Sequence, residues 1–516
     1  MKKLTGLLFV IVLAGSSCKK ALDVNQNPNQ PTAVTPNVVL SAALVGTASN
    51  NAFDFPGVSR WMGYFSRSGN YVPDVQTETY TIPNDYTDGE WSNIYLNLNS
   101  YDYIEKTGQS LDLPFYVGVA KVMKAYNFGI LVDMYNDVPY KEAFQISAII
   151  KPKYDKGEDI YVDLVHQCDS AIQYFEKAKV FYAAQPSSVG STDDQYDVMF
   201  GSGKSGAVSQ DDRLVLWEKF TNTLKLKLLL TMSNVATQQG LITTEIDAIN
   251  TNGFGFLGVG ESATVNPGYT ASNGKISPVF ALFRKLDGTP TNADAYYRAN
   301  TYAVNFYVGT EDERQYVVYS GVSGNPGSNY DGDPASVPNA NTAGVGPGLV
   351  KDFTQVAVIL SDFESLFLQA EAVQRGWNVT GNAKNLYESA VEQNYVYLAS
   401  GKTASGIITT PVPDAQSYLS LGHDLADWSA SPDKLATIMT QKWIALNGIS
   451  WVTAYSDYRR THFPGPAILG ISHSSDHVQP QIPTRFLYPQ SEFNTNGSNV
   501  PSLGANGQFT TVFWNQ

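Results

Sequence analysis

The chain has 516 residues, of which 43% are hydrophobic and 16% are charged, and its formal net charge is −14. This apolar content is enough for a large folded core and excludes a mainly disordered chain. An acidic surface repels phosphate backbones, so nucleic-acid binding is excluded as the main function. Tyrosine is abundant, with 31 Tyr against 24 Phe, and an excess of amphipathic rings often indicates a binding surface.

The N-terminus has the features of a secretory signal. Lys2 and Lys3 provide positive charge, and the apolar run that follows, residues 4–14, is shorter than the roughly 20 residues that span a membrane. Small residues then precede Cys18, as in bacterial lipoprotein signals, although Gly15 stands where those signals usually have Leu. We expect residues 1–17 to be a lipoprotein signal peptide and Cys18 to carry the lipid.

The next segment predicts a flexible connection to one folded domain. Residues 18–36 are dominated by Asn, Gln and Pro and have little to bury, which is typical of a tether. We expect the folded domain to span residues 37–516. Its single cysteine, Cys168, lies on an apolar helical stripe, so we expect a buried thiol rather than a reactive one.

Helices are predicted at both ends of this domain. In the first part, Thr87 and Glu90 have capping-box spacing, Pro114 has the position of a first-turn proline, and Leu-rich sequence fills residues 211–232. In the last part, Ser361 and Glu364 form a second capping box before a helix that Gly376 ends. Two further helices are expected over residues 382–398 and from Pro432 to about Gly448.

The middle of the domain, about residues 234–350, differs from both ends. It is rich in Gly, Asn, Ser and Thr, which predicts loops and short strands. A long irregular region in a compact protein usually forms functional surface. The fold class expected from these patterns is mainly α, with paired helices and a loop-rich part.

Motifs for catalysis or metal binding are weak or absent. The segment 201–205 resembles a P-loop, but Val198 stands where its first glycine belongs. His473 and His477 lie in Ser- and Pro-rich sequence, which favours an exposed loop over a metal site. No GxSxG motif occurs. We therefore expect no catalytic residue, no metal and no cofactor, although a pair of carboxylates across a cleft would leave no trace in sequence spacing.

Several segments in order resemble the SusD/RagB family of outer-membrane nutrient-binding lipoproteins, in its SusD-like branch. Each segment alone is weak, but together they cover the mature chain. They are Asn25–Thr32, Trp91–Tyr95, Val132–Ala143, Phe363–Ala372, Arg375–Trp377, Gln441–Gly448, Asp457–Thr461 and Arg485–Glu492.

The resemblance implies paired tetratricopeptide-like helices and a lipid anchor in the outer membrane, with the protein exposed on the cell surface. It also implies a partner, a SusC-like TonB-dependent transporter, and a ligand that is usually an oligosaccharide and less often a peptide. No catalysis is implied. Because ligand contacts vary among members of the family, the matching motifs assign no ligand-binding residue.

Candidate ligand contacts follow from the chemistry of sugars. A sugar ring has an apolar C–H face and a rim of hydroxyls, so it packs on flat aromatic rings and bonds to amides and carboxylates. Trp61, Tyr64 and Tyr86 are the best candidates in loop-like sequence. The other candidates lie near them or in the middle region: Arg67, Tyr71, Asn84, Asp85, Tyr296 and Tyr297.

Three alternatives remain open beside an oligosaccharide-binding lipoprotein. The first is a peptide-binding lipoprotein of the same kind of uptake complex. The second is a structural lid whose main role is contact with the transporter. The most remote is a glycoside hydrolase or esterase, which would need carboxylates, or a nucleophile and a base, that converge in a cleft.

Replacing Cys18 tests the predicted anchor. Cys18→Ala should yield an unlipidated, soluble protein, because the residue that carries the acyl chain is removed. Metabolic labelling with radioactive palmitate measures this directly, with Cys168→Ala as the matched control that should still be labelled. Label on the Cys18→Ala protein would contradict the prediction.

Overall fold

The structure is a computed structural model that describes residues 34–52, 57–145, 148–201, 210–320 and 327–515. The predicted signal peptide, Cys18 and all but the end of the predicted tether lie outside these residues. So does the segment 202–205 of the P-loop-like motif.

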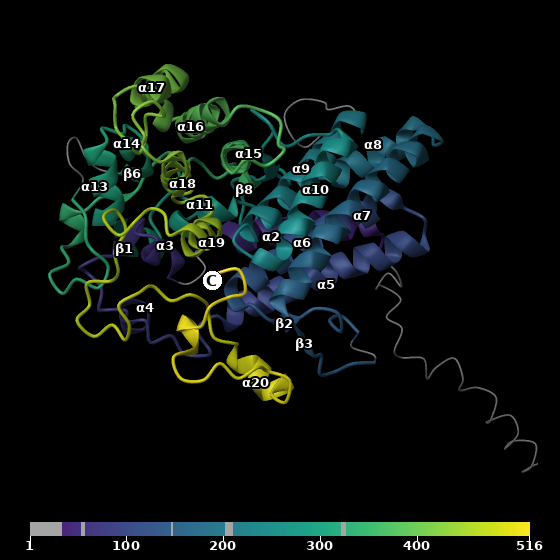
Figure 1. The fold of residues 1–516 in the computed structure, drawn as a ribbon, viewed down its shortest axis with the longest axis horizontal. Helices are drawn as coiled ribbons and strands as arrows, with labels where there is room; N and C mark the ends of the chain where they lie inside the picture. The colour runs from purple at the N-terminus through teal and green to yellow at the C-terminus, as the bar shows by residue number, and fades with distance from the viewer. Residues whose placement is uncertain (1–33, 53–56, 146–147, 202–209, 321–326, 516) are drawn as a thin grey trace, which may run out of the picture.

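Helices dominate the described residues, which confirms the predicted mainly-α class (Figure 1). The longer helices fall into an N-terminal and a C-terminal group, with short helices between and beside them. The N-terminal group is α2 (Pro36–Ala52), α5 (Asp88–Ser110), α6 (Pro114–Tyr135), α7 (Gly157–Ala183), α8 (Ser187–Tyr196), α9 (Gln210–Thr231) and α10 (Gln239–Asn252). The C-terminal group is α15 (Asp362–Gln374), α16 (Ala383–Ala399), α17 (Pro411–Tyr418), α18 (Lys434–Ala445) and α19 (Trp451–Thr461).

In the N-terminal group, α6 is the central helix and is buried on nearly every face. It packs against α5 and α7, and α7 in turn packs against α9. Pro114 opens α6 as predicted, and Cys168 is fully buried in α7. Helix α5 begins after Thr87 as predicted, but the Thr87 side chain makes no capping bond, so the predicted capping box is wrong in its chemistry.

In the C-terminal group, the second predicted capping box is partly confirmed. The Ser361 hydroxyl accepts a hydrogen bond from the backbone N–H of Glu364 at 3.1 Å and starts α15. The Glu364 side chain does not complete the box, because it binds Lys227 of α9 at 2.8 Å. Gly376, with φ +79°, ends the helix as predicted. Helices α15 and α16 then pack as a pair, with α18 against α15.

The middle region holds more helix than predicted. Helix α10 was not expected from its polar, Gly- and Asn-flanked sequence. The remaining elements are short, as expected, and the strands form four antiparallel pairs. The short helices are α3 (Val58–Trp61), α4 (Val75–Thr79), α11 (Pro278–Phe283), α12 (Asn292–Tyr296), α13 (Thr301–Gly309), α14 (Gln315–Val318) and α20 (Gln490–Asn496). The strand pairs are β1 (Phe65–Arg67) with β5 (Tyr297–Ala299), β2 (Val138–Pro139) with β3 (Tyr154–Asp155), β4 (Ala263–Val265) with β8 (Ala357–Leu360), and β6 (Tyr319–Ser320) with β7 (Gly344–Val345).

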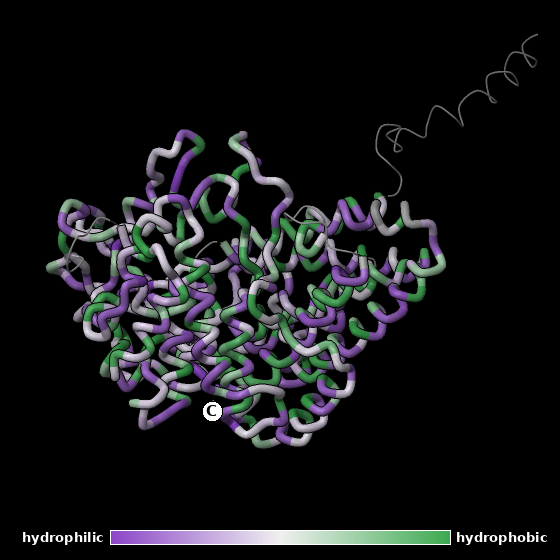
Figure 2. The backbone as a smooth tube through the Cα atoms, turned by 90° about the horizontal axis from the view of Figure 1, so that it is seen from above, coloured by the Kyte–Doolittle hydropathy of each residue, from purple (hydrophilic) through white to green (hydrophobic). Residues whose placement is uncertain are grey.

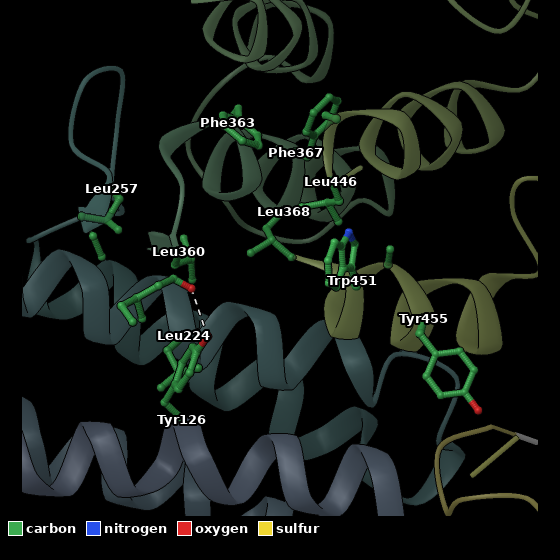
Figure 3. Packing of buried hydrophobic residues seen from close by; sticks show 14 of the residues in the cluster. Tyr126, Leu224, Leu257, Leu360, Phe363, Phe367, Leu368, Leu446, Trp451 and Tyr455 are labelled. Carbon is green, nitrogen blue, oxygen red and sulfur yellow. Dashed lines mark hydrogen bonds between the residues drawn. The ribbon is translucent and has the colours of Figure 1, made fainter. Parts of the chain in front are cut away.

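One hydrophobic core joins the two helical groups. Tyr126 of α6 donates a hydrogen bond to the backbone carbonyl of Ile359 in β8 at 3.0 Å, and apolar side chains of α9, α15 and α19 surround this point (Figure 3). Hydrophobic and hydrophilic residues alternate along the helices, as expected for helices with one buried face (Figure 2). None of the helices in the described ranges has the length and apolar character of a membrane-spanning segment.

Buried charges tie three C-terminal helices together. Glu371 of α15 binds the guanidinium of Arg460 in α19 at 2.5 and 2.9 Å and that of Arg375 at 2.8 Å. Asp457 of α19 binds Arg460 and also Lys442 of α18, at 2.8 and 2.7 Å. Burial alone would raise the pKa of Glu371, but the two guanidiniums outweigh it and hold that pKa below its ordinary value.

Removing the charge of Glu371 should destabilise the fold in a pH-dependent way. We expect Glu371→Gln to lower the free energy of unfolding at pH 7 by about 3–5 kcal/mol, because it leaves Arg460 buried without its main partner. A carboxyl whose pKa is lower in the folded state contributes stability that is present above its ordinary pKa and is lost as the pH falls through the folded value. The difference in free energy of unfolding between the native protein and the variant should therefore shrink below about pH 4.5.

Urea unfolding at several pH values measures this gap. Glu388→Gln is the matched control, since Glu388 pairs with Lys384 on the surface at 3.7 Å. That variant should change the free energy of unfolding by less than about 0.5 kcal/mol. A gap for Glu371→Gln that stays constant down to about pH 3 would contradict the assignment of the effect to carboxylate charge.

Candidate functional site

Two of the best predicted ligand contacts lie in the hydrophobic core. Trp61 is 3% exposed, and its ring stacks on Phe486 with centroids 5.3 Å apart. Tyr64 is fully buried, stacks on Trp443 at 5.6 Å and donates its hydroxyl to the Trp443 carbonyl. Neither ring is open to solvent, so the prediction that these rings contact sugar directly is wrong. Their segment is aromatic because it packs against α18 and the C-terminal segment.

Of four other candidates, three have structural partners and one, Asp85, is exposed. Arg67 is buried and binds Glu78 at 2.6 Å. Tyr86 is half-buried, with its hydroxyl 2.6 Å from that of Thr77. Asn84 donates to the carbonyl of Tyr488 at 2.9 Å, and Asp85 is exposed. The prediction that Arg67 contacts the ligand is therefore wrong, because this side chain is buried against Glu78. Ligand contact by Asn84, Asp85 and Tyr86 stays a prediction.

The remaining candidates lie beside one another. The rings of Tyr71 and Tyr296 meet edge to face at 5.3 Å, and both are half-buried. Tyr297, the next residue, turns its ring to Phe65 and Phe283 in the interior. The structure therefore brings Tyr71 and Tyr296 together at the surface, from two segments that were proposed separately, and their contact with a ligand stays a prediction.

A buried ionic cluster centred on Arg60 fixes this region. The Arg60 guanidinium binds Asp74 and Asp331 at 2.7 Å and Glu78 at 3.0 Å. It also donates to the Tyr296 hydroxyl at 2.7 Å. Because these partners come from α4, the end of α12 and the loop at residue 331, one side chain positions three segments of the chain. We refer to Arg60 with Asp74, Glu78 and Asp331 as the Arg60 cluster.

The Arg60 cluster is well bonded but not electrically neutral. Asp74, Glu78 and Asp331 supply three negative charges and Arg60 one positive charge. Arg67, which binds Glu78 from outside the cluster, adds a second positive charge, so one negative charge remains in excess. Burial raises the pKa of Asp331, with a further rise from Glu78, and Arg60 opposes both effects. Burial by itself would lower the pKa of Arg60, but the surrounding carboxylates and Tyr296 raise it well above its usual range.

Three loops meet beside this cluster and form a continuous surface. They are residues 68–80, 327–339 and 471–478, which we call the three-loop face. Backbone hydrogen bonds join them: Gly69 to Val337 at 3.0 Å, His473 to Asp331 at 2.8 Å, and Val478 to Thr79 at 3.0 Å. In Figure 1 the yellow-green segment after α19 runs beside α4 at the lower left of the molecule.

A stack of aromatic rings lies on the three-loop face. Tyr330 and His473 are parallel, with centroids 3.9 Å apart and planes 9° apart, and His473 is exposed. Tyr302 of α13 meets Tyr330 edge to face at 5.0 Å and donates its hydroxyl to the carbonyl of Ile471 at 3.0 Å. We call these three rings the aromatic platform. A flat, firmly supported ring that faces water is what the apolar side of a sugar ring requires.

A glycine allows the loops to approach closely under this platform. Gly332 has φ +71°, a conformation that favours glycine. A Cβ there would lie 2.1 Å from the hydroxyl oxygen of Ser472. The loop at 327–339 can therefore cross the loop at 471–478 only because residue 332 has no side chain.

Sequence reasoning missed most of this platform. Neither Tyr302 nor Tyr330 is among the predicted ligand contacts, and His473 was considered only as a metal ligand. An isolated aromatic in a Gly-, Ser- and Asn-rich loop, such as Tyr330, was the available signal. Within the described ranges, no three His, Cys, Asp or Glu side chains are placed to hold a metal ion.

Two cavities elsewhere fit a ligand less well. The first cavity, of about 60 Å³, lies in the core between α6, α9 and α19. This volume is too small for a sugar ring. A groove of about 410 Å³ lies between α5, α6 and α7, above Phe128 and Phe144. Three of its lysines pair with its own carboxylates; Lys121, for example, binds Glu105 at 2.9 Å. Most of its charged groups are therefore paired within the groove itself.

The comparisons with known proteins agree with this architecture. The chain matches the SusD-like family model, described as starch-binding and associating with the outer membrane, over residues 28–489. None of the curated proteins compared with it matches.

Solved structures with the same fold include a SusD homologue from Bacteroides fragilis (19% identity, TM-score 0.71), for which 94% of this chain and 100% of that one align. A chitin-binding SusD homologue from Flavobacterium johnsoniae aligns at 18% identity and TM-score 0.71, over 92% and 98% of the two chains. A SusD/RagB family protein from Bacteroides thetaiotaomicron aligns at 19% identity and TM-score 0.70, over 94% and 99%. Since the family match spans most of the sequence and these folds agree along almost their whole length, the chain belongs to the SusD-like branch of the SusD/RagB family, whose members are binding proteins.

Proposed function

We propose that this chain is a cell-surface lipoprotein that binds an oligosaccharide on its three-loop face and delivers it to a SusC-like TonB-dependent outer-membrane transporter. The lipid on Cys18 anchors it in the outer membrane. The observation that carries the proposal is the aromatic platform, in which Tyr302 and Tyr330 support an exposed His473.

The surroundings of the platform supply the hydrogen bonds that sugar hydroxyls need. Asn70, Asp333 and Asp476 lie on the same three loops with side chains that are exposed or half-buried. Amide and carboxylate groups can accept from sugar hydroxyls, and amides can also donate. A ring platform with such a rim orients a sugar without covalent chemistry.

The ionic environment supports binding rather than hydrolysis. A glycosidase needs one carboxyl that holds a proton and a second that acts as a base or nucleophile. In the Arg60 cluster, Asp74, Glu78 and Asp331 all bind the same guanidinium, so each of these carboxyl groups already has a partner within the protein. These carboxylates therefore act as supports for the loops.

Calorimetric titration with maltohexaose, chitohexaose and an unrelated hexapeptide tests the proposal, with chromatography of each sugar after incubation. The two sugars follow the family description and the chitin-binding relative. Binding of either sugar without shortening is expected. Shortened products would instead support a hydrolase, and binding of the peptide alone would support a peptide-uptake lipoprotein.

Removing the platform should weaken sugar binding without unfolding the protein. Tyr330→Ala with His473→Ala is expected to weaken binding of the hexaose by about 10-fold or more, since two stacking rings are lost. Tyr316→Ala is the matched control, because Tyr316 is a 41% exposed tyrosine on α14, outside the three-loop face. Equal affinity of the double variant and the control would place the ligand elsewhere.

Weakening the Arg60 cluster should loosen the face that it positions. Arg60→Lys keeps the charge but cannot bind three carboxylates and a hydroxyl in a fixed geometry. We expect affinity for the hexaose to fall about 10-fold and hydrogen exchange to rise in residues 68–80 and 327–339, with unchanged helical circular dichroism. Arg375→Lys, a change at a buried pair outside the face, should leave binding intact. Unchanged exchange in both loops would contradict the positioning role.

A further inference from the structure

The sequence of the three-loop face is unusual in its charge. The stretches 68–105, 315–350 and 461–484 contain no Lys or Arg. Together they make 98 residues. The whole chain has 34 Lys and Arg in 516 residues, so about six would be expected in a stretch of this total length. The same stretches contain Asp and Glu, so their negative charges are not offset along the chain.

The structure brings one part of each stretch, residues 68–80, 327–339 and 471–478, into one surface, whereas residues 88–105 of the first stretch belong to α5. Ser472 of the third stretch donates its backbone N–H to the Tyr80 hydroxyl of the first stretch at 2.7 Å. His473 bonds to Asp331 of the second stretch, and Gly69 to Val337. The absence of positive charge is therefore a property of the face as well as of the sequence.

Three arginines that lie close to the face are buried and already bound. Arg60 and Arg67 are each 4% exposed and are outnumbered by the carboxylates they bind. Arg298 is 9% exposed and donates to Thr342 at 3.0 Å. These guanidiniums cannot turn towards a ligand without breaking buried bonds.

Two carboxylates beside the platform have no such neutralising partner. Asp333 is two residues from Asp331 in the platform loop, and Asp476 is exposed in the loop of His473. Among the ion pairs of the described residues, none includes Asp333 or Asp476. An acidic group on a ligand that stacked on the platform would therefore meet negative charge with no cation to receive it.

We propose that the three-loop face selects uncharged oligosaccharides and rejects acidic ones, such as those built from uronic acids or bearing sulfate. This inference rests on the proposed function. The platform makes the contact, whereas Asp333 and Asp476 set the charge that a ligand can carry. Repulsion of this kind determines specificity more than affinity for the correct ligand.

The test compares one sugar in two charge states. Maltohexaose and chitohexaose are each titrated beside the same hexaose whose C6 hydroxymethyl groups have been oxidised to carboxylates. The assay is run at about pH 8, where histidine side chains are ordinarily neutral. The oxidised form should bind at least about 10-fold more weakly than its parent. This affinity ratio, parent over oxidised sugar, should shrink in about 0.5 M NaCl because salt screens exposed charges.

Variants that remove charge test whether Asp333 and Asp476 cause the weaker binding of the oxidised sugar. Asp333→Asn with Asp476→Asn should reduce this affinity ratio at least about 3-fold. Because the ratio compares two sugars on the same variant, a change in hydrogen bonding that affects both sugars alike does not alter it. Glu388→Gln with Glu392→Gln on α16 removes the same charge at a distance and should leave the ratio unchanged. An oxidised sugar that binds as tightly as its parent, or a ratio that the first double variant does not alter, would overturn the inference while the proposed function stands. Failure of both parent sugars to bind would overturn the proposed function, and the inference with it.

Discussion

The binding face depends on the bonds of one arginine. Arg60 lies in α3, a single helical turn, yet its guanidinium reaches carboxylates on α4 and at residue 331. A guanidinium has five N–H donors in a fixed plane, so it can hold several acceptors in a defined geometry. The three-loop face has no extended sheet to support it, since the strands nearby are two or three residues long. Its shape is instead fixed by this buried charge cluster and a few backbone hydrogen bonds.

The rest of the molecule provides a rigid base for that face. Helices α5, α7 and α9 pack around α6, which is buried on nearly every face, while α15, α18 and α19 are joined by Glu371, Asp457 and Arg460. Buried ion pairs of this kind are weak contributors to stability relative to apolar packing, but they specify which groups must lie together. The same principle operates in the helical core and at the binding face. In each place, charges that cannot be left unpaired determine how neighbouring segments align.

Sequence patterns predicted the scaffold much better than the site. Helix ends were predicted correctly at Pro114, Ser361 and Gly376. The signal at each of these positions comes from the backbone chemistry of the residue itself, so it can be read from the local sequence. Helix α10 was missed because its apolar residues are few and its ends are rich in Asn and Gly. Trp61 and Tyr64 were misplaced because an aromatic residue in irregular sequence can face either the core or solvent. Their burial is decided by Phe486 and Trp443, which are more than 370 residues away along the chain.

The same long separations explain why the platform was not foreseen. Tyr330 and His473 stack only because their loops cross at Gly332, a contact that no local pattern encodes. The family resemblance gave the architecture and the general function, but it assigned no ligand contact, since the loops of the family vary. The useful local signals were compositional: isolated rings in Gly-, Asn- and Ser-rich sequence, and long stretches without Lys or Arg.

The distances along the chain between contacting residues of the face also bear on how it forms. Arg60 and Asp331 are 271 positions apart, Tyr302 and His473 171, and Tyr80 and Ser472 392. Closing such long loops is entropically unfavourable until other contacts have brought the segments together, so they assemble late in folding. A chain that stops before residue 471 lacks the third loop of the face, however well its first helices have packed. Sugar binding would therefore report that the entire polypeptide, from α3 to the segment after α19, has reached its final arrangement.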